Sequence, residues 1–235
     1  CIAAEVHAVT LFWDLSVETV RRLRGEGVLV ACQVGSLSEA RAAEDAGADI
    51  LIVQGLEAGG HRAVFADDDT ASDLTLLAAL QLIAAAVDLP LIATGALTTG
   101  AAIAAALVLG ATAAQVGTAY LLSPEAGTSA AQRAATASAT PTALTRAFSG
   151  RTARGIVNRF LSEHDAAAPS AYPEIHHLTT PLRAHGRSTG DADLINLWAG
   201  QAHALAAALP AAEITRTLAA DARAALAAAR SRLGG

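Results

Sequence analysis

The sequence has no lysine and no methionine, and only 3% of its 235 residues are aromatic. All of its basic residues are arginines, so Schiff-base chemistry and a lysine-type phosphate clamp are both excluded. Because the chain begins at Cys1 and has no methionine, it reads as part of a longer protein whose N-terminal portion is missing.

Cysteine and positive charge are also scarce. Cys1 and Cys32 are too few for a disulfide framework, which fits a reducing, cytoplasmic location. The net charge of −6, without a basic stripe, argues against nucleic acid as a partner. The long apolar stretches are alanine-rich and interrupted by glycine, so no membrane span is expected.

Short apolar runs alternate with alanine-rich helical segments over the first two thirds of the chain. This alternation predicts an α/β fold with parallel strands buried on both faces. The spacing is compatible with either an open doubly wound sheet or part of a (β/α)8 barrel. The expected strands are 6–12, 28–34, 50–53, 91–94 and 113–116, and the helices between them are 17–24, 38–46, 74–87 and 100–109.

Two local patterns refine this scheme. Ser36 and Glu39 form the S-x-x-E pattern of a capping box at the start of the second helix. Beyond Ser123 the pattern becomes helical and irregular: residues 165–173 read as a loop, and two long helices are expected at 191–209 and 211–233, separated by Pro210.

The sequence QGLEAGGHR follows the third strand directly. Gly59 and Gly60 would let the backbone approach a planar or anionic ligand where Cβ atoms would collide. His61 then lies at the carboxyl end of a strand, where it can exchange a proton near neutral pH. An ordinary tight turn with an exposed histidine explains the same residues equally well.

Two further glycine-containing loops follow the fourth and fifth strands. ATGALTTG, residues 93–100, would present N–H groups and a helix N-terminus to a phosphate. In AAQVGTAYL, residues 113–121, Gly117 and Thr118 would complete a phosphate cup between consecutive strands. Each loop alone is also an ordinary strand-to-helix connection.

The other polar residues are better explained as structural or solvent-exposed residues than as catalytic residues or metal ligands. Ser149 could be a nucleophile, but no G-x-S-x-G elbow surrounds it. His176, His177 and His203 lack spaced cysteine or carboxylate partners, and residues 67–69, three aspartates, read as a solvated turn. No metal site is predicted.

The combination of QGLEAGGHR, LPLIATGALTTG, ALVLGATAAQVGTAYLLSPE, AFSGRTARGIVNRF and LWAGQAHALAAALPAAEI resembles the nitronate monooxygenase family. The resemblance implies a TIM (β/α)8-type barrel, N-terminally truncated here to about five βα units, plus C-terminal helices. The expected division is a partial FMN-binding barrel at 1–160 and a C-terminal loop and helices at 161–235.

The resemblance also implies a flavoprotein oxidoreductase that uses FMN and O2 to convert alkyl nitronates, such as propionate 3-nitronate, to carbonyl compounds and nitrite in a detoxification role. His61 would be the catalytic residue. The cofactor-binding residues would be Gln54, Gly59, Gly60, Gly95, Ala96, Gln115, Val116, Gly117 and Thr118. Formation of a homo-oligomer is left open.

Two departures from the family pattern and two alternatives accompany this prediction. The family usually has glycine at the positions of Ala63 and Ala96, and Ala96 is tolerable only if its φ is negative. The alternatives are an FMN-dependent enoyl-thioester reductase, and an inactive barrel fragment that needs missing N-terminal strands.

Overall fold

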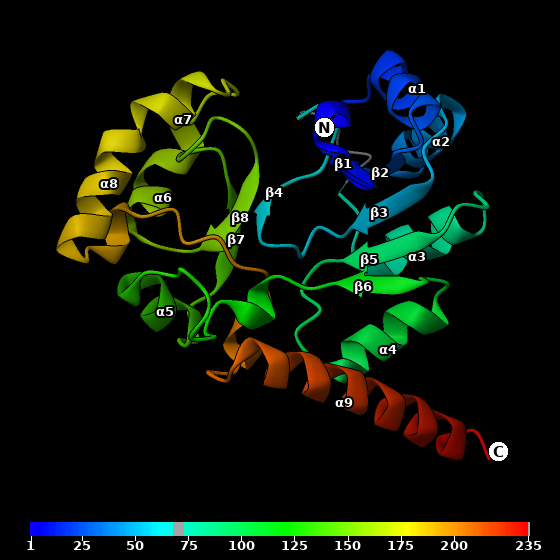
Figure 1. Ribbon diagram of the computed structural model, residues 1–235. Helices are drawn as coiled ribbons and strands as arrows, with labels where there is room; N and C mark the ends of the chain where they lie inside the picture. Colours follow the sequence, from blue (N-terminus) through cyan, green and yellow to red (C-terminus); the bar gives the residue numbers. More distant parts are fainter. Residues whose placement is uncertain (68–72, 235) are drawn as a thin grey trace. The chain divides into compact units, whose positions relative to one another are not determined.

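The computed structural model describes residues 1–67 and 73–234 (Figure 1). By its internal contacts the chain divides into two compact units, which are described separately. The first unit comprises residues 1–56, 62–95 and 105–115, and the second comprises residues 57–61, 96–104 and 116–235.

The first unit is built on a five-stranded parallel sheet. Its strands are β1 (Ala8–Leu11), β2 (Leu29–Val34), β3 (Ile50–Gln54), β5 (Leu91–Thr94) and β6 (Ala113–Gln115). Neighbours in the sheet follow chain order, β1-β2-β3-β5-β6, as the arrows of Figure 1 show. A doubly wound sheet reverses its strand order at a switch point, whereas a barrel does not. The order therefore favours the barrel-type alternative.

Burial differs between the central and outer strands of this sheet. Val30, Val34, Leu51 and Val53 are fully buried, as expected for β2 and β3. The outer strands β1 and β6 alternate between exposed and half-buried residues, so the prediction of burial on both faces is wrong there. Within the described residues each of these two strands has a sheet neighbour on one side only, which leaves part of its surface in water.

The helices of the predicted βα units lie close to their expected positions. They are α1 (Val17–Gly25), α2 (Leu37–Ala46), α3 (Leu76–Ala84) and α4 (Gly100–Val108). The N-cap half of the predicted capping box is confirmed, since Ser36 Oγ accepts from the Glu39 amide at 3.3 Å. The Glu39 carboxylate accepts from the amides of Gly35 at 2.7 Å and Phe65 at 2.6 Å. Glu39 thus ties the helix start to the chain that follows β4.

The second unit contains strands that the sequence did not predict. Its antiparallel sheet has the order β4-β8-β7, formed by β4 (Gly60–His61), β7 (Thr142–Thr145) and β8 (Ala153–Ile156). The register pairs Gly60 with Arg154 and His61 with Ala153. The accompanying helices are α5 (Ala130–Thr136), α6 (Arg159–His164), α7 (Glu174–Leu178), α8 (Thr180–Thr189) and α9 (Ala211–Arg232).

Of the two long C-terminal helices predicted, one is confirmed and one is wrong. The second is α9, which packs Ile214 and Leu218 against Ala119. The first, 191–209, is instead two short 3-10 turns, Ala192–Leu194 and His203–Leu205, joined by extended chain that pairs with β8 at Gly155. Pairing with β8 overrides the helix propensity of its alanines.

Candidate functional site

Gly59 lies directly against the backbone of residues 199 and 200. A Cβ atom built on Gly59 would fall 2.4 Å from the Ala199 carbonyl carbon and 2.5 Å from the Gly200 amide nitrogen. Glycine is therefore required here so that the protein's own chain can approach, a requirement that no local sequence pattern indicated. Gly60 differs: it has a φ of +80° and nothing within 4 Å of its Cβ position.

Gly200 connects three segments of the second unit. Its amide donates to Thr118 Oγ1 at 3.0 Å, and the neighbouring Gln201 amide donates to the Glu57 carbonyl oxygen at 3.0 Å. The Cβ position of Gly200 lies 3.4 Å from Ala96 Cα. Residues 200 and 201, which the sequence analysis placed in a helix, thus contact Glu57, Ala96 and Thr118.

His61 is held by a hydrogen bond and by aromatic rings. Its Nε2 lies 2.9 Å from Ser149 Oγ. Its ring meets those of Trp198 and Tyr172 edge to face, at centroid distances of 5.7 and 6.1 Å. The half-buried imidazole is fixed on these sides, whereas the sequence allowed an exposed turn histidine.

Two glycines position the partners of His61. The Trp198 ring covers Gly155, whose Cβ position is 2.9 Å from Trp198 Cε3. Gly150 has a φ of +76°, and its Cβ position lies 2.2 Å from the Ala171 carbonyl oxygen, next to Tyr172. Ser149, which precedes Gly150, is 2% exposed.

The loop after β6 presents its backbone to the surface. Gly117 is exposed, and no heavy atom lies within 4 Å of its Cβ position. Val116 packs against Ala119 and α9, and Thr118 begins a 3-10 turn that ends at Tyr120. Gly117 is thus open to solvent beside Thr118, and the phosphate-binding role of these two residues stays a prediction.

Ala96 does not have the negative φ that its accommodation in this loop was expected to require. Its φ is +51°, in the left-handed region that non-glycine residues rarely adopt, and Gly95 has a φ of +138°. The expectation that alanine would be accommodated by a negative φ is wrong. The Thr98 amide donates to the Ala96 carbonyl oxygen at 3.0 Å, so the turn holds the alanine in this conformation at a cost of about 1 kcal/mol.

Three of the predicted residues belong to the first unit. Gln54 is buried, and its Oε1 accepts from the Ala63 amide at 2.8 Å. Gly95 approaches the backbone of Gly55, with 3.2 Å between its Cβ position and the Gly55 nitrogen. Gln115 is exposed at the end of β6.

The pKa shifts of Cys32 and His176 indicate the charge states of these two side chains. Burial, and then Asp49, raise the pKa of the Cys32 thiol to about 11, so it is not a thiolate at neutral pH. Desolvation, then Arg183 and His177, lower the pKa of His176, which favours its neutral form. Among the described residues no three histidine, cysteine, aspartate or glutamate side chains gather as a metal site, and Asp68 and Asp69 lie outside them. Nor is any described helix both long and apolar enough to cross a bilayer.

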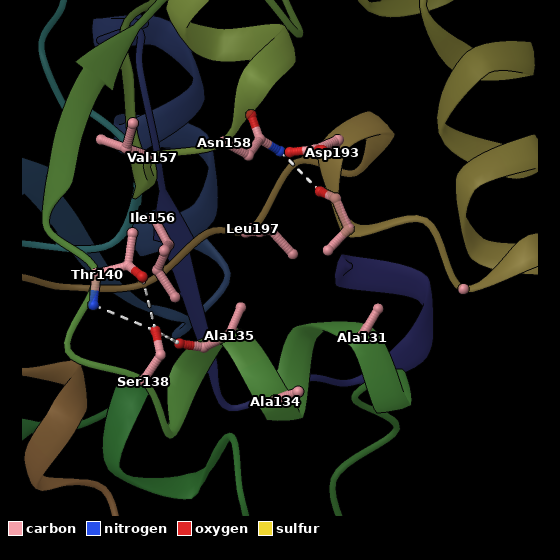
Figure 2. Close-up of a pocket in the computed structure, with 12 residues that line it drawn as sticks. Ala131, Ala134, Ala135, Ser138, Thr140, Ile156, Val157, Asn158, Asp193 and Leu197 are labelled. Carbon is pink, nitrogen blue, oxygen red and sulfur yellow. Dashed lines mark hydrogen bonds between the residues drawn. The ribbon is translucent and has the colours of Figure 1, made fainter.

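The second unit also holds a cavity of about 370 Å³ away from the predicted residues (Figure 2). Alanines of α5 face Ile156 and Leu197 across it. Its polar groups bond to the protein itself: Ser138 donates to the Ala135 carbonyl, and Asn158 to the Ala192 and Ile195 carbonyls. None of the predicted site residues lines this cavity.

The solved structures that match this chain agree on its fold. A crystal structure of a nitroalkane oxidase from Streptomyces ansochromogenes matches with a TM-score of 0.92 and 42% identity, over 97% of this chain and 67% of that one. FabK from Thermotoga maritima matches with a TM-score of 0.84 and 26% identity, over 99% of this chain and 73% of that one. The fold is thus confirmed as α/β of the TIM-barrel type, corresponding to about two thirds of these structures.

The family follows from the sequence comparisons. The nitronate monooxygenase family description matches residues 1–221. A nitronate monooxygenase of Pseudomonas aeruginosa is 43% identical over 208 residues, which cover 86% of this chain and 59% of that protein. The chain belongs to the nitronate monooxygenase family, and it spans about three fifths of the length of this relative.

Sequence reasoning missed Tyr172 and Trp198 and gave Ser149 no partner. The Trp-Ala-Gly-Gln run inside the helix predicted at 191–209 was a usable signal, because glycine is a poor residue for a helix interior. The contact between Ser149 and His61 spans 88 positions and had no local signal.

Alanine substitutions at Gly59 and Gly60 separate two effects on stability. At Gly59 the new Cβ would collide with the backbone of residues 199 and 200, and at Gly60 it would only strain a positive φ. Gly59→Ala should lower the free energy of unfolding by about 3 kcal/mol, because its Cβ meets rigid backbone. Gly60→Ala should lower it by about 1 kcal/mol, through its positive φ alone. Urea unfolding measures both. Gly25→Ala, which has neither constraint, is the control. Equal losses at positions 59 and 60 would contradict the account given for Gly59.

Replacing Ala96 should relieve its strain. Ala96→Gly should raise the free energy of unfolding by about 0.5–1 kcal/mol, because glycine adopts a positive φ without the Cβ penalty. The control Ala105→Gly, at an exposed position inside α4, should lower it by about 1 kcal/mol. A loss of stability in Ala96→Gly would show that the alanine is not strained.

Proposed function

We propose that this chain is the catalytic part of an FMN-dependent enzyme that oxidises alkyl nitronates with O2 to carbonyl compounds and nitrite. The observation that carries the proposal is the placement of His61. The chain belongs to the nitronate monooxygenase family, and His61 is the histidine of its AGGH loop. The His61 side chain contacts Ser149, Trp198 and Tyr172. Because the chain spans only part of its relatives, the activity is proposed for the whole protein.

The second unit offers groups that suit the phosphate of FMN. Thr118 Oγ1 already accepts from Gly200, which leaves its hydroxyl proton to donate to a phosphate oxygen. Gly117 exposes its backbone beside it, and Val116 anchors the loop in the core. Ala96 Cα and Thr118 Oγ1 both lie close to the Cβ position of Gly200, at 3.4 and 3.3 Å. These residues would hold the phosphate, and bound FMN would supply the redox chemistry.

The remaining cofactor assignments are proposed from the family resemblance. Gln54, Gly59, Gly60, Gly95 and Gln115 are assigned to FMN contacts. The bond from the Ala63 amide to Gln54 Oε1 orients the buried side-chain amide of Gln54. The division at residue 160 into a barrel part and a C-terminal part likewise remains a prediction.

His61 has a different task for each form of the substrate. A neutral nitroalkane must lose a proton from the carbon that bears the nitro group, and an imidazole can accept it near neutral pH. A nitronate anion needs no such step and is stabilised by a hydrogen-bond donor. The edges of the Trp198 and Tyr172 rings limit how far the imidazole can turn.

The function is tested with the purified protein, FMN and propionate 3-nitronate. A stoichiometric flavin spectrum, with O2 consumption and nitrite release, would support the proposal. Rapid bleaching of the flavin by NADH, with none by nitronate, would instead indicate the enoyl-thioester reductase. A colourless protein that gains no flavin on reconstitution would indicate the inactive fragment.

His61→Asn should affect the two substrate forms unequally. For neutral nitroalkanes kcat/KM should fall about 10²–10⁴-fold, the range that positioned proton transfer contributes. For preformed nitronates the loss should be smaller, since no proton is removed. The control His185→Asn changes an exposed histidine of α8 and should leave both unchanged. Equal losses on both substrates would show that His61 is not the base.

A further inference from the structure

His203 is a buried histidine whose two ring nitrogens both meet backbone carbonyl groups. It begins the 3-10 turn His203–Leu205 and is 3% exposed. Its Nδ1 lies 2.9 Å from the Thr136 carbonyl oxygen, and its Nε2 lies 2.9 Å from the Thr140 carbonyl oxygen. Thr136 is the last residue of α5, where the carbonyl groups of a helix have no intrahelical partner. The ring therefore links its turn to the end of α5 and to the loop that follows.

These contacts determine how many protons the His203 ring carries. A carbonyl oxygen can only accept, so each ring nitrogen must donate to form its hydrogen bond. A neutral imidazole has one N–H, and it would leave the lone pair of the other nitrogen pointing at a carbonyl oxygen 2.9 Å away. The imidazolium has an N–H on both nitrogens and satisfies both carbonyls. Turning the ring over would put carbon atoms at both positions and forfeit both bonds.

Few other ionisable side chains lie on the described elements around His203. Residues 137–141, which follow α5, include none. Helix α5 carries Arg133, whose guanidinium donates to the Ser123 carbonyl oxygen at 2.9 Å. The neighbouring 3-10 turn carries Tyr120. Neither of these two side chains is a carboxylate, so the two carbonyl groups are what stabilise a charge on the buried ring.

Helix α5 also holds the segment that precedes His203. Gln132 of α5 donates from Nε2 to the Trp198 carbonyl oxygen at 3.1 Å. Residues 198–203 are thus tied to α5 at both ends, at Trp198 by Gln132 and at the other end by the His203 ring. The Trp198 ring meets the His61 ring edge to face. The His203 ring therefore helps to hold the segment that carries a partner of His61.

We propose that His203 is a positioning residue that carries two ring protons in the folded chain, and that the charged ring holds the Trp198 segment beside His61. Loss of either proton replaces one hydrogen bond by repulsion between a nitrogen lone pair and a carbonyl oxygen, so the ring must leave one of its carbonyls. The folded chain then binds a proton that an exposed imidazole releases near neutral pH. The contact is therefore intact at acidic pH and is lost once the pH is high enough to remove that proton.

The proton count is measured on the ¹⁵N-histidine-labelled full chain by proton–nitrogen correlation spectroscopy, which distinguishes protonated from unprotonated ring nitrogens. At neutral pH we expect two protonated nitrogens at His203, with the exposed His185 as the reference for an ordinary imidazole. His203→Gln assigns the signals, and sequential backbone assignment does so if that variant does not fold. An unprotonated ring nitrogen at His203 under these conditions would overturn the proposal.

The positioning role is measured through the fluorescence of Trp198. Trp13→Phe leaves Trp198 as the only tryptophan, and His61→Asn removes the other imidazole beside it. In this double variant we expect a pH-dependent change in emission that follows the His203 titration seen by NMR. His203→Gln is neutral and should lose that change, whereas the control His185→Asn should retain it.

A change in emission that survives His203→Gln would contradict the positioning role, and so would constant emission while His203 loses a proton. If His203→Gln does not fold, agreement or disagreement between the NMR and fluorescence titrations of the double variant decides. Neither measurement uses FMN or turnover. Absence of nitronate oxidation would therefore reject the proposed function and leave the charge of His203 standing, and a neutral His203 would leave the proposed function standing.

Discussion

The site depends on how closely the backbone of residues 197–201 approaches its neighbours. Gly59 and Gly155 each place a bare Cα where a side chain would collide with another segment, and a Cβ on Gly200 would be crowded by Glu57 and Thr118. Hydrogen bonds from Ile156 to Leu197, from Gly200 to Thr118 and from Gln201 to Glu57 then hold this strand-like segment in place. Without these glycines Trp198 could not lie over β8 with its edge towards His61.

The polar contacts of the site extend this framework. Ser149 Oγ lies 2.9 Å from His61 Nε2, and it also contacts the carbonyl oxygen and the amide of Arg151. The turn around Gly150 is thereby connected to His61 within the second unit.

Sequence patterns predicted the parallel strands well and the second unit poorly. The strands β2, β3 and β5 were found because runs such as VLVACQV and LIAT are apolar and bounded by turn residues. Strands β7 and β8 were missed because TALT and ARGI carry little apolar signal and are held by pairing with each other. The loops bearing His61, Ala96 and Thr118 were identified from glycine. The partners of His61 were not, because contacts between positions 61, 149 and 198 leave no trace in local composition.

The hydrogen bonds around residues 197–201 have a consequence for how the second unit opens. One short segment supplies partners to β8, to the chain before β4 and to the 3-10 turn at Thr118, so none of these anchors can be released alone. We expect these anchors to open together, as a cooperative foldon whose members exchange their amide protons as a group. His61, whose ring contacts Trp198, would then keep its position until the whole cluster opens.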